Sequence, residues 1–321
     1  MREFSLPPHR DINTGRNTGA MTISLNALLA VLLLVAALSV VLLETSVRRR
    51  IRAFRPLQLF TLGSAFLLVP ANIALLGGNA PANLERWVSL GSVAALATQL
   101  LLLVSGWIPV GAAAPTRRIL AVGAHPDDLE LACGGTLARL ADAGHEIHAI
   151  VVADGAVGGN AGERAGEAQR AGTFLGVTSL RTLGLPDTCL AEHENTLTAA
   201  IEEKIRVLNP DIIFTHSAHD QHQDHTAVHR ATMRAGRRHP AILCYESPSA
   251  TANFSPQVFV DITDYTGVKS AGVAIHADQM DKPYMAGDVL TAKANFRGEQ
   301  AKMEAAEAFE AVRIPAFRGV L

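Results

Sequence analysis

Two clusters of histidine and aspartate stand out among the polar residues that could do chemistry. The stretch 125–128 is His-Pro-Asp-Asp, and the run 216–225 holds four histidines and two aspartates. Adjacent carboxylates repel each other unless a cation compensates their charge. Zinc accepts both imidazole nitrogen and carboxylate oxygen, and a catalytic zinc site leaves one position open for water. The pattern predicts that one of Asp127 and Asp128 binds a metal ion while the other faces the water, with a histidine of the second cluster as a further ligand.

Each cluster directly follows an apolar run that we expect to be a strand, at 118–124 and at 211–215. The carboxyl ends of parallel strands meet at one edge of a sheet, so the two clusters could share a pocket although they are far apart in sequence. The alternatives are a polar turn at 125–128, because proline and aspartate favour turns, and a solvated loop at 216–225. The coincidence of both clusters at strand ends favours the metal site.

The rest of the C-terminal two-thirds alternates between strand and helix patterns. This alternation predicts an α/β fold, a Rossmann-like and mostly parallel sheet flanked by helices. The further expected strands are 146–153, 180–183, 242–245 and 258–262, and the expected helices are 129–143, 164–175, 196–208, 267–280 and 297–310.

Several short motifs in this part of the chain resemble the LmbE/PIG-L family of zinc-dependent N-deacetylases, which act on N-acetylglucosamine-type sugar conjugates. The resemblance covers nearly all of 118–310, and the combination of 125–128 with the downstream His-Gln-Asp-His at 222–225 is its most specific part. The other matching positions are 124–130, 133–138, Asp154 with Gly155 and Gly158, Arg164 with Glu167, Leu175 with Gly176, His276 with Gln279, and 306–309.

The resemblance implies a metal site and a set of catalytic residues. His125, Asp128 and His225 would bind one Zn²⁺ ion, although the same ligand types could hold iron or another divalent metal. Asp127 would be the general base that takes a proton from the water. His222, in a cationic form, would stabilise the oxyanion and protonate the leaving amine. The two remaining implied roles belong to Asp224, which would hold the tautomer of His222, and to Arg164, which would contact the substrate.

The first third of the chain contains three uncharged apolar runs, at 25–43, 57–76 and 88–108. Each has about the 20 residues that a helix needs to cross a bilayer. Trp87 and Trp107 lie at the two ends of the third run, where indole rings favour a membrane interface. Pro70 and Asn72 interrupt the second run. We therefore expect about three transmembrane helices within 25–110, after an N-terminal tail at 1–24, and we reject a cleaved signal peptide because arginines follow the first run.

The distribution of arginine predicts the orientation. Basic residues concentrate on the cytoplasmic side of a membrane. Seven arginines lie in the 44–56 loop or just after the third run, on one side of the membrane, and four lie on the opposite side. If translation starts at Met21, three of those four are absent and the bias becomes stronger. With three spans, a linker at 111–117 would lead into a deacetylase domain at 118–321 on the cytoplasmic side. Two spans would reverse that side.

Composition limits the classes of function. The 321 residues carry a net charge of -2, so nothing suggests nucleic-acid binding, and 49% hydrophobic residues exclude a disordered chain. We expect a multi-pass membrane hydrolase that removes acetyl from an N-acetylglucosamine-type glycoconjugate, with a lipid-linked conjugate as one candidate because of the bilayer. The alternatives are a non-catalytic membrane scaffold that binds zinc or sugar, and a metallo-esterase or phosphatase.

Overall fold

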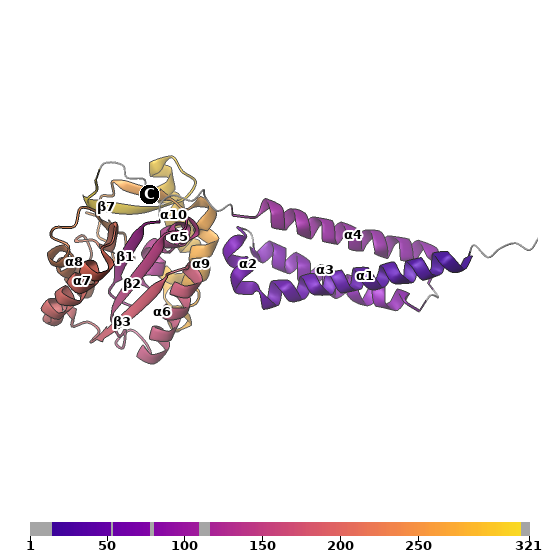
Figure 1. Cartoon of the computed structure of the whole chain (residues 1–321), viewed down its shortest axis with the longest axis horizontal. Coiled ribbons are helices and arrows are strands. Elements are labelled where there is room, and N and C mark those ends of the chain that lie inside the picture. The colour runs from indigo at the N-terminus through magenta and orange to yellow at the C-terminus, as the bar shows by residue number, and fades with distance from the viewer. Residues whose placement is uncertain (1–14, 53, 78–79, 109–115, 316–321) are drawn as a thin grey trace, which may run out of the picture. The chain divides into compact units, whose positions relative to one another are not determined.

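A computed structural model describes residues 15–52, 54–77, 80–108 and 116–315, with side chains from residue 25 onward (Figure 1). The chain divides into two compact units, 1–107 and 108–321. Most of the predicted linker at 111–117, and residues 1–14 of the predicted tail, lie outside the described residues.

The N-terminal unit contains the three apolar helices that the sequence predicts. These are α1 (Gly15–Leu42), α3 (Phe54–Leu75) and α4 (Ala82–Ser105), with the short α2 (Glu44–Arg50) after α1. Pro70 lies inside α3, and the helix continues beyond it. By length and composition, all three long helices could cross a membrane.

The three helices bury polar side chains and expose apolar ones. The interhelical hydrogen bonds run from Ser89 Oγ to Asn26 Oδ1 (3.0 Å), from Asn72 Nδ2 to Ser92 Oγ (2.8 Å) and from Gln99 Nε2 to Ser64 Oγ (2.8 Å). The large exposed side chains include Leu59 (72% exposed), Phe66 (80%) and Leu101 (66%). Apolar side chains such as Leu33 and Leu57 are buried as well, so the helices are apolar on both the inside and the outside, unlike a water-soluble bundle, whose outer face is polar.

The C-terminal unit is built on a seven-stranded sheet of order β3-β2-β1-β4-β5-β7-β6. The first five strands in this order run parallel, and β7 pairs antiparallel with both β5 and β6. The bounds are β1 (Arg118–Gly123), β2 (Glu146–Ala153), β3 (Ser179–Leu185), β4 (Ile212–His216), β5 (Ile242–Tyr245), β6 (Val258–Asp261) and β7 (Ala306–Arg313).

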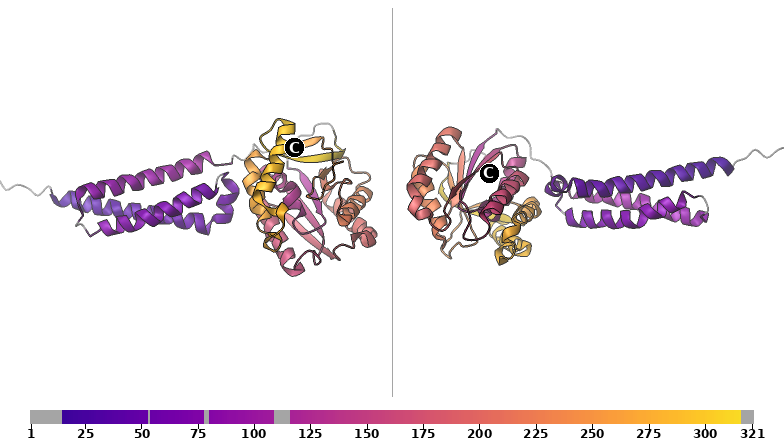
Figure 2. Two further views of the ribbon diagram at one scale, coloured as in Figure 1. Left: turned by 180° about the vertical axis from the view of Figure 1, so that it is seen from behind. Right: turned by 90° about the horizontal axis from the view of Figure 1, so that it is seen from below.

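Helices cover both faces of this sheet (Figure 2). Side chains alternate along each strand, so Ile119 and Ala121 of β1 join one core while Leu120 and Val122 join the other. The first core includes residues of α5 (Asp128–Asp142), α6 (Ala161–Leu175), α9 (Thr266–Val273) and α10 (Gly287–Ala301), and the second includes residues of α7 (Glu194–Leu208) and α8 (Gln223–Ala235).

The prediction of a helix at 297–310 is wrong in its second half. Helix α10 ends at Ala301, Lys302 takes a left-handed conformation with φ 60°, and β7 begins at Ala306. Alanine and glutamate in this segment favour a helix locally. Pairing with β5 and β6 overrides that preference, because it places Phe309 and Glu307 in the interior.

Glu307 of β7 is a buried structural carboxylate. Its oxygens accept hydrogen bonds from the amides of Gly135 (3.0 Å) and Thr136 (2.7 Å) and from Lys269 Nζ (2.6 Å). Helix α5 is interrupted at Cys133, whose φ is -139°. Glu307 therefore satisfies the amides that this interruption leaves without a helical partner, and Lys269 neutralises its charge.

Replacing Glu307 by methionine should destabilise the C-terminal unit by about 3–5 kcal/mol, because it leaves the Lys269 ammonium buried without a partner. Denaturant unfolding followed by circular dichroism measures the change. The double variant Glu307→Met/Lys269→Met removes both charges and should unfold at a higher denaturant concentration than Glu307→Met alone. The reverse order would contradict this account.

Candidate active site

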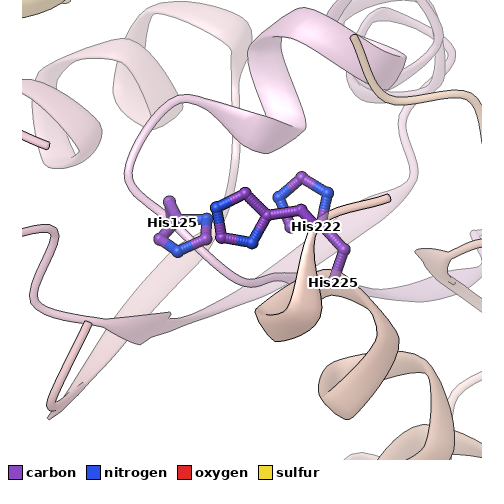
Figure 3. Close-up of side chains that lie close together, drawn as sticks. All are labelled: His125, His222 and His225. Carbon is purple, nitrogen blue, oxygen red and sulfur yellow. The ribbon is translucent and has the colours of Figure 1, made fainter. Parts of the chain in front are cut away.

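The two predicted clusters lie at the carboxyl ends of adjacent strands. The stretch 125–128 connects β1 to α5, and the second cluster runs from the last residue of β4 to the first turn of α8. Strands β1 and β4 are neighbours in the sheet. The ring centroids of His125 and His225 are 5.3 Å apart, and those of His125 and His222 are 4.7 Å apart (Figure 3). The structure therefore brings the two clusters into one site.

The two ring nitrogens of His125 have different surroundings. Nδ1 lies 3.5 Å from Asp128 Oδ2, while Nε2 lies 3.1 Å from both Asp187 Oδ1 and Asp224 Oδ2. A carboxylate on the far nitrogen of a metal-binding histidine fixes its tautomer and its orientation. His125 is therefore held so that Nδ1 faces Asp128.

His225 is oriented in the same way from the other side of Asp128. Its Nε2 lies 3.3 Å from Asp128 Oδ1, and its Nδ1 lies 2.9 Å from Asp220 Oδ2. The hydroxyls of Ser247 and Ser249 donate to the Asp220 carboxylate, the latter at 2.7 Å. Because Asp220 is anchored in this way, Nε2 of His225 stays turned toward Asp128. The side chains whose ligand atoms lie within 4.8 Å of one another form three groups, and the predicted ligands are distributed among them: His125–His222–His225, Asp128–His216–His225 and His125–Asp187–Asp224.

The charges of this cluster suit a cation. Burial lowers the pKa of His225, but Asp128 and Asp220 outweigh it and raise that pKa to about 9. Burial likewise opposes charge on His125, and hydrogen bonds to Asp128, Asp187 and Asp224 raise its pKa well above the usual value. Both imidazoles would bind protons at neutral pH in the absence of a metal. The donor types, the burial and the excess negative charge fit a divalent ion held by His125, Asp128 and His225.

His216 also reaches Asp128, with its Nε2 3.2 Å from Asp128 Oδ2 and its ring stacked on His225 at 3.9 Å. The Ala124 amide donates to that same Nε2 at 3.0 Å. Burial and the nearby His225 lower the pKa of His216 to about 4, so it is neutral. Because an amide already engages its Nε2 lone pair, we leave His216 outside the predicted ligand set, although it forms a group with Asp128 and His225 whose ligand atoms lie within 4.8 Å of one another.

Asp127, the predicted base, has an environment unlike that of Asp128. It is 5% exposed, and its backbone adopts a φ of 125°, a strained value for a residue with a side chain. Burial and the adjacent Asp128 raise its pKa to about 7, against the opposing effect of Arg164. A carboxylate with a pKa near neutrality can take and return a proton.

Arg164, predicted to contact substrate, is 3% exposed at the base of the cavity. It donates from Nη1 to the Gly155 carbonyl oxygen (2.8 Å) and from Nη2 to the Pro126 carbonyl oxygen (3.0 Å). Its Nη2 is 3.5 Å from Asp127 Oδ2. These contacts fix the backbone and the side chain of the predicted base.

The predicted role of Asp224 requires a correction. Its carboxylate contacts His125 and accepts hydrogen bonds from the Thr188 and Leu190 amides, whereas its backbone amide donates to His222 Nδ1 at 3.2 Å. His222 is the residue that precedes α8, so the first turn of that helix fixes its tautomer. Burial and the nearby imidazoles of His225 and His125 lower the pKa of His222, which favours its neutral form. A neutral His222 with an occupied Nδ1 carries its proton on Nε2.

Sequence reasoning missed Asp187, and it gave no role to Asp220 and His216, which lie within the second cluster. Asp187 and Asp220 orient the two histidine ligands, and His216 contacts Asp128. Asp187 follows the end of β3, so the rule that functional residues gather beyond the carboxyl ends of strands could have found it.

A cavity of about 360 Å³ opens above these residues. His125, Asp127, Asp128 and His225 form its buried floor. The other lining residues are Leu131, Val157, Gly158, Arg164, Asp187, Thr188, His222, Pro248, Ser249, Lys282 and Tyr284.

Titration of the metal-free protein with Zn²⁺ should release protons at pH 7, because the raised pKa of His225, about 9, keeps that imidazole protonated until the ion displaces the proton. The apparent affinity should therefore rise with pH and level off above about pH 9. Calorimetry in buffers of different ionisation enthalpy measures the number of protons released.

Asp220→Asn should lower Zn²⁺ affinity by about 10- to 100-fold through loss of orientation of His225, and should reduce the proton release. Asp281→Asn, an exposed aspartate outside the cavity lining, is the matched control. Proton release that is absent in the wild type, or unchanged in Asp220→Asn, would contradict this description of the site.

Comparison with known proteins identifies the family. The family model of PIG-L, described as GlcNAc-PI de-N-acetylase, matches residues 120–236. The uncharacterized deacetylase YaiS of Escherichia coli is 41% identical over 165 residues, which are 49% of this chain and 89% of that protein. The diacetylchitobiose deacetylase of Thermococcus kodakarensis is 28% identical over 188 residues, 51% of this chain and 70% of that protein.

An enzyme that catalyses a different reaction has the same fold. The crystal structure of GalB, the 4-carboxy-2-hydroxymuconate hydratase of Pseudomonas putida, matches with a TM-score of 0.56 at 22% identity, over 64% of this chain and 99% of that one. The architecture alone therefore does not define the reaction. The extent and identity of the match to YaiS, together with the family model over the strands and loops that carry the site, show that this chain belongs to the PIG-L family.

Proposed function

We propose that the protein is a metal-dependent N-deacetylase that hydrolyses the acetamide of an N-acetylglucosamine-type conjugate. The observation that carries this proposal is the pairing of two adjacent aspartates with opposite properties on the floor of one cavity. Asp128 lies between two oriented imidazoles, and Asp127 has a pKa of about 7. Membership of the PIG-L family and the similarity to a diacetylchitobiose deacetylase support the substrate class.

The reaction needs a base for water and a donor for the carbonyl oxygen. A divalent ion held by His125, Asp128 and His225 would supply Lewis-acid polarisation of the carbonyl and would lower the pKa of a water. Asp127 accepts a proton from the attacking water, whose oxygen forms the new bond to the carbonyl carbon. The C–N bond then breaks, and the proton passes to the leaving amine, giving acetate and the free amino sugar.

Two further side chains support this sequence of steps. His222 presents Nε2–H at the cavity, where it donates to the carbonyl oxygen as negative charge develops on it. Arg164 holds Asp127 and the preceding carbonyl in place, so that the base keeps its position while its protonation changes.

Asp127→Asn should reduce the rate of acetate release by about 10²- to 10⁴-fold, because amide oxygen is a much weaker base than carboxylate. The assay measures acetate from N-acetylglucosaminyl conjugates in the metal-loaded enzyme, with Asp281→Asn as the exposed control. Turnover that stays at the wild-type level would refute Asp127 as the base.

The same substitution should stabilise the metal-free protein at high pH. The folded pKa of Asp127 is raised from 3.8 to about 7, so its favourable contribution is complete below about pH 4 and is lost as pH rises through 7. Asparagine cannot ionise, so the free energy of unfolding of the variant at pH 8 should exceed that of the wild type by at most about 4 kcal/mol, with little gain at pH 4; denaturant unfolding at the two pH values measures both. A gain at pH 4 equal to that at pH 8 would contradict this origin.

We also propose that the N-terminal unit anchors the enzyme in a lipid bilayer, with the catalytic unit on the cytoplasmic side. Three helices of sufficient length, apolar side chains on their outside and hydrogen bonds among buried polar side chains support membrane insertion. The arginines of α2 and the residues that follow it support an inside position for the loop between α1 and α3.

Single cysteines in α2 and in the first turn of α4 test this orientation in a Cys189→Ser background, since Cys133 and Cys244 are buried. A membrane-impermeant maleimide should label Asn83→Cys in intact cells and should label Ser46→Cys only after permeabilisation. The opposite pattern would place the catalytic unit outside, and labelling of both in intact cells would exclude a membrane-spanning bundle.

A further inference from the structure

Thr188 has an unusual backbone conformation for its residue type. Within the described part of the chain, four residues other than glycine have a positive φ: Asp127, Thr188, Asn209 and Lys302. Asn209 and Lys302 end α7 and α10, where a left-handed residue is common. Asp127 and Thr188 instead line the cavity. Thr188, with a φ of 65°, is the β-branched member of this set, and a β-branched side chain makes this conformation unfavourable.

The left-handed turn at Thr188 serves the predicted metal site. The amides of Thr188 (2.7 Å) and Leu190 (3.1 Å) donate to the Asp224 carboxylate, which also contacts His125. The preceding residue, Asp187, places Oδ1 3.1 Å from His125 Nε2. The turn therefore brings two carboxylates to one imidazole. Glycine would adopt the same backbone conformation without strain, so the backbone alone does not account for a threonine at this position.

The hydroxyl of Thr188 is available to a ligand. Thr188 is exposed at the cavity wall, and among the described residues none forms a hydrogen bond with its Oγ1. Other polar groups of the lining are already occupied. Asp187 Oδ2 accepts two amides from residues 157–158 (3.0 and 3.3 Å), and Ser249 Oγ donates to Asp220 (2.7 Å). Thr188 thus offers an uncharged donor and acceptor to a molecule in the cavity.

The position of Thr188 indicates which group of a substrate it meets. Asp224 Oδ2 contacts both the Thr188 amide and His125 Nε2, so a single carboxylate separates Thr188 from the cavity floor. In the proposed reaction the acetamide lies on that floor. In N-acetylglucosamine the acetamide is attached to C2, whose ring neighbours are C1 and C3. Because C1 carries the rest of the conjugate, the nearest free hydroxyl is the one on C3.

We propose that Thr188 is a specificity-determining residue whose hydroxyl binds the C3 hydroxyl of the N-acetylated sugar. This inference rests on the proposed deacetylase function. The contact would fix the rotation of the sugar ring while the floor binds the acetamide. The strained backbone then persists because the side chain contributes to substrate binding and not to stability. Sugars without a free hydroxyl at C3 would be poorer substrates.

The test uses substrates that differ by one hydroxyl. The panel is the methyl glycoside of N-acetylglucosamine, called here the parent, with its 3-deoxy and 6-deoxy analogues. Acetate release by the full-length, metal-loaded enzyme in detergent gives kcat/KM for each. Because a single hydrogen bond between uncharged groups is lost, we expect the wild type to favour the parent over the 3-deoxy analogue by about 3- to 10-fold.

Variants at Thr188 assign that preference. Thr188→Val keeps the shape and removes the hydroxyl. It should lower the parent-to-3-deoxy ratio of kcat/KM by about 3- to 10-fold, mainly through KM for the parent, and leave the parent-to-6-deoxy ratio unchanged. Thr188→Ser should keep most of the wild-type ratio. Thr182→Val, at an exposed position of β3 outside the cavity lining, is the matched control and should keep both ratios.

Thr188→Gly separates substrate binding from a structural role. It should lose the preference as Thr188→Val does. It should nevertheless unfold at no lower denaturant concentration than the wild type, because glycine adopts a φ of 65° without strain. A lower midpoint for Thr188→Gly would show that packing retains the threonine, and this result would overturn the proposal.

Failure of this inference can be distinguished from failure of the deacetylase function. If the wild type releases acetate equally well from the parent and the 3-deoxy analogue, or if Thr188→Val keeps the wild-type ratio, the role of Thr188 is overturned while deacetylation stands. If no substrate releases acetate, calorimetric binding of the parent and the 3-deoxy analogue to the wild type and to Thr188→Val decides the matter. Equal binding of the two compounds to the wild type overturns the role of Thr188 there as well.

Discussion

Buried negative charge at the ends of β1 and β4 is the constraint on which the rest of the site depends. Asp127, Asp128, Asp187, Asp220 and Asp224 are all less than 10% exposed. Desolvated carboxylates persist only with a positive partner or with many hydrogen bonds. The fold supplies the hydrogen bonds from backbone amides and serine hydroxyls, and it supplies two imidazoles that can bind either protons or an ion. This excess of buried negative charge is the reason why we propose that the site holds a cation.

Two neighbouring carboxylates take different roles because their surroundings differ. Asp128 accepts the His125 amide at 2.6 Å and lies among imidazoles that lower its pKa well below the usual value. Asp127 is equally buried, but Arg164, the cation beside it, also donates hydrogen bonds to two carbonyl oxygens. Burial and the negative charge of Asp128 therefore outweigh the effect of Arg164 and raise the pKa of Asp127. Environments that separate the pKa values of two titratable groups are how a single site obtains a charged ligand and a base near neutral pH.

The two units of the chain follow opposite rules of burial. The sheet unit buries its aliphatic side chains in two cores, one on each face. The helical unit buries asparagine, serine and glutamine together with some of its apolar side chains, and it exposes many leucines, valines and phenylalanines. Each distribution is favourable only in its own surroundings, water for the first and hydrocarbon for the second, which is the basis for proposing a membrane anchor attached to a water-exposed catalytic unit.

The sequence by itself determined the features that local patterns encode. Apolar runs predicted β1, β2, β4 and β5, and the longer uncharged runs predicted three long helices. The residue types at 125–128 and 222–225 indicated the candidate ligands and the candidate base. Tertiary structure alone decided which groups surround them. Asp187 and Asp220 meet the ligand histidines, and Asp224 turns its carboxylate toward His125, through contacts between strand ends or across a loop. It also decided that 306–313 is a strand. Pairing with β5 on one side and with β6 on the other stabilises this segment more than the helix that its local sequence favours. Local propensity is a property of neighbouring residues, whereas charge compensation and strand pairing depend on residues that only the folded chain brings together.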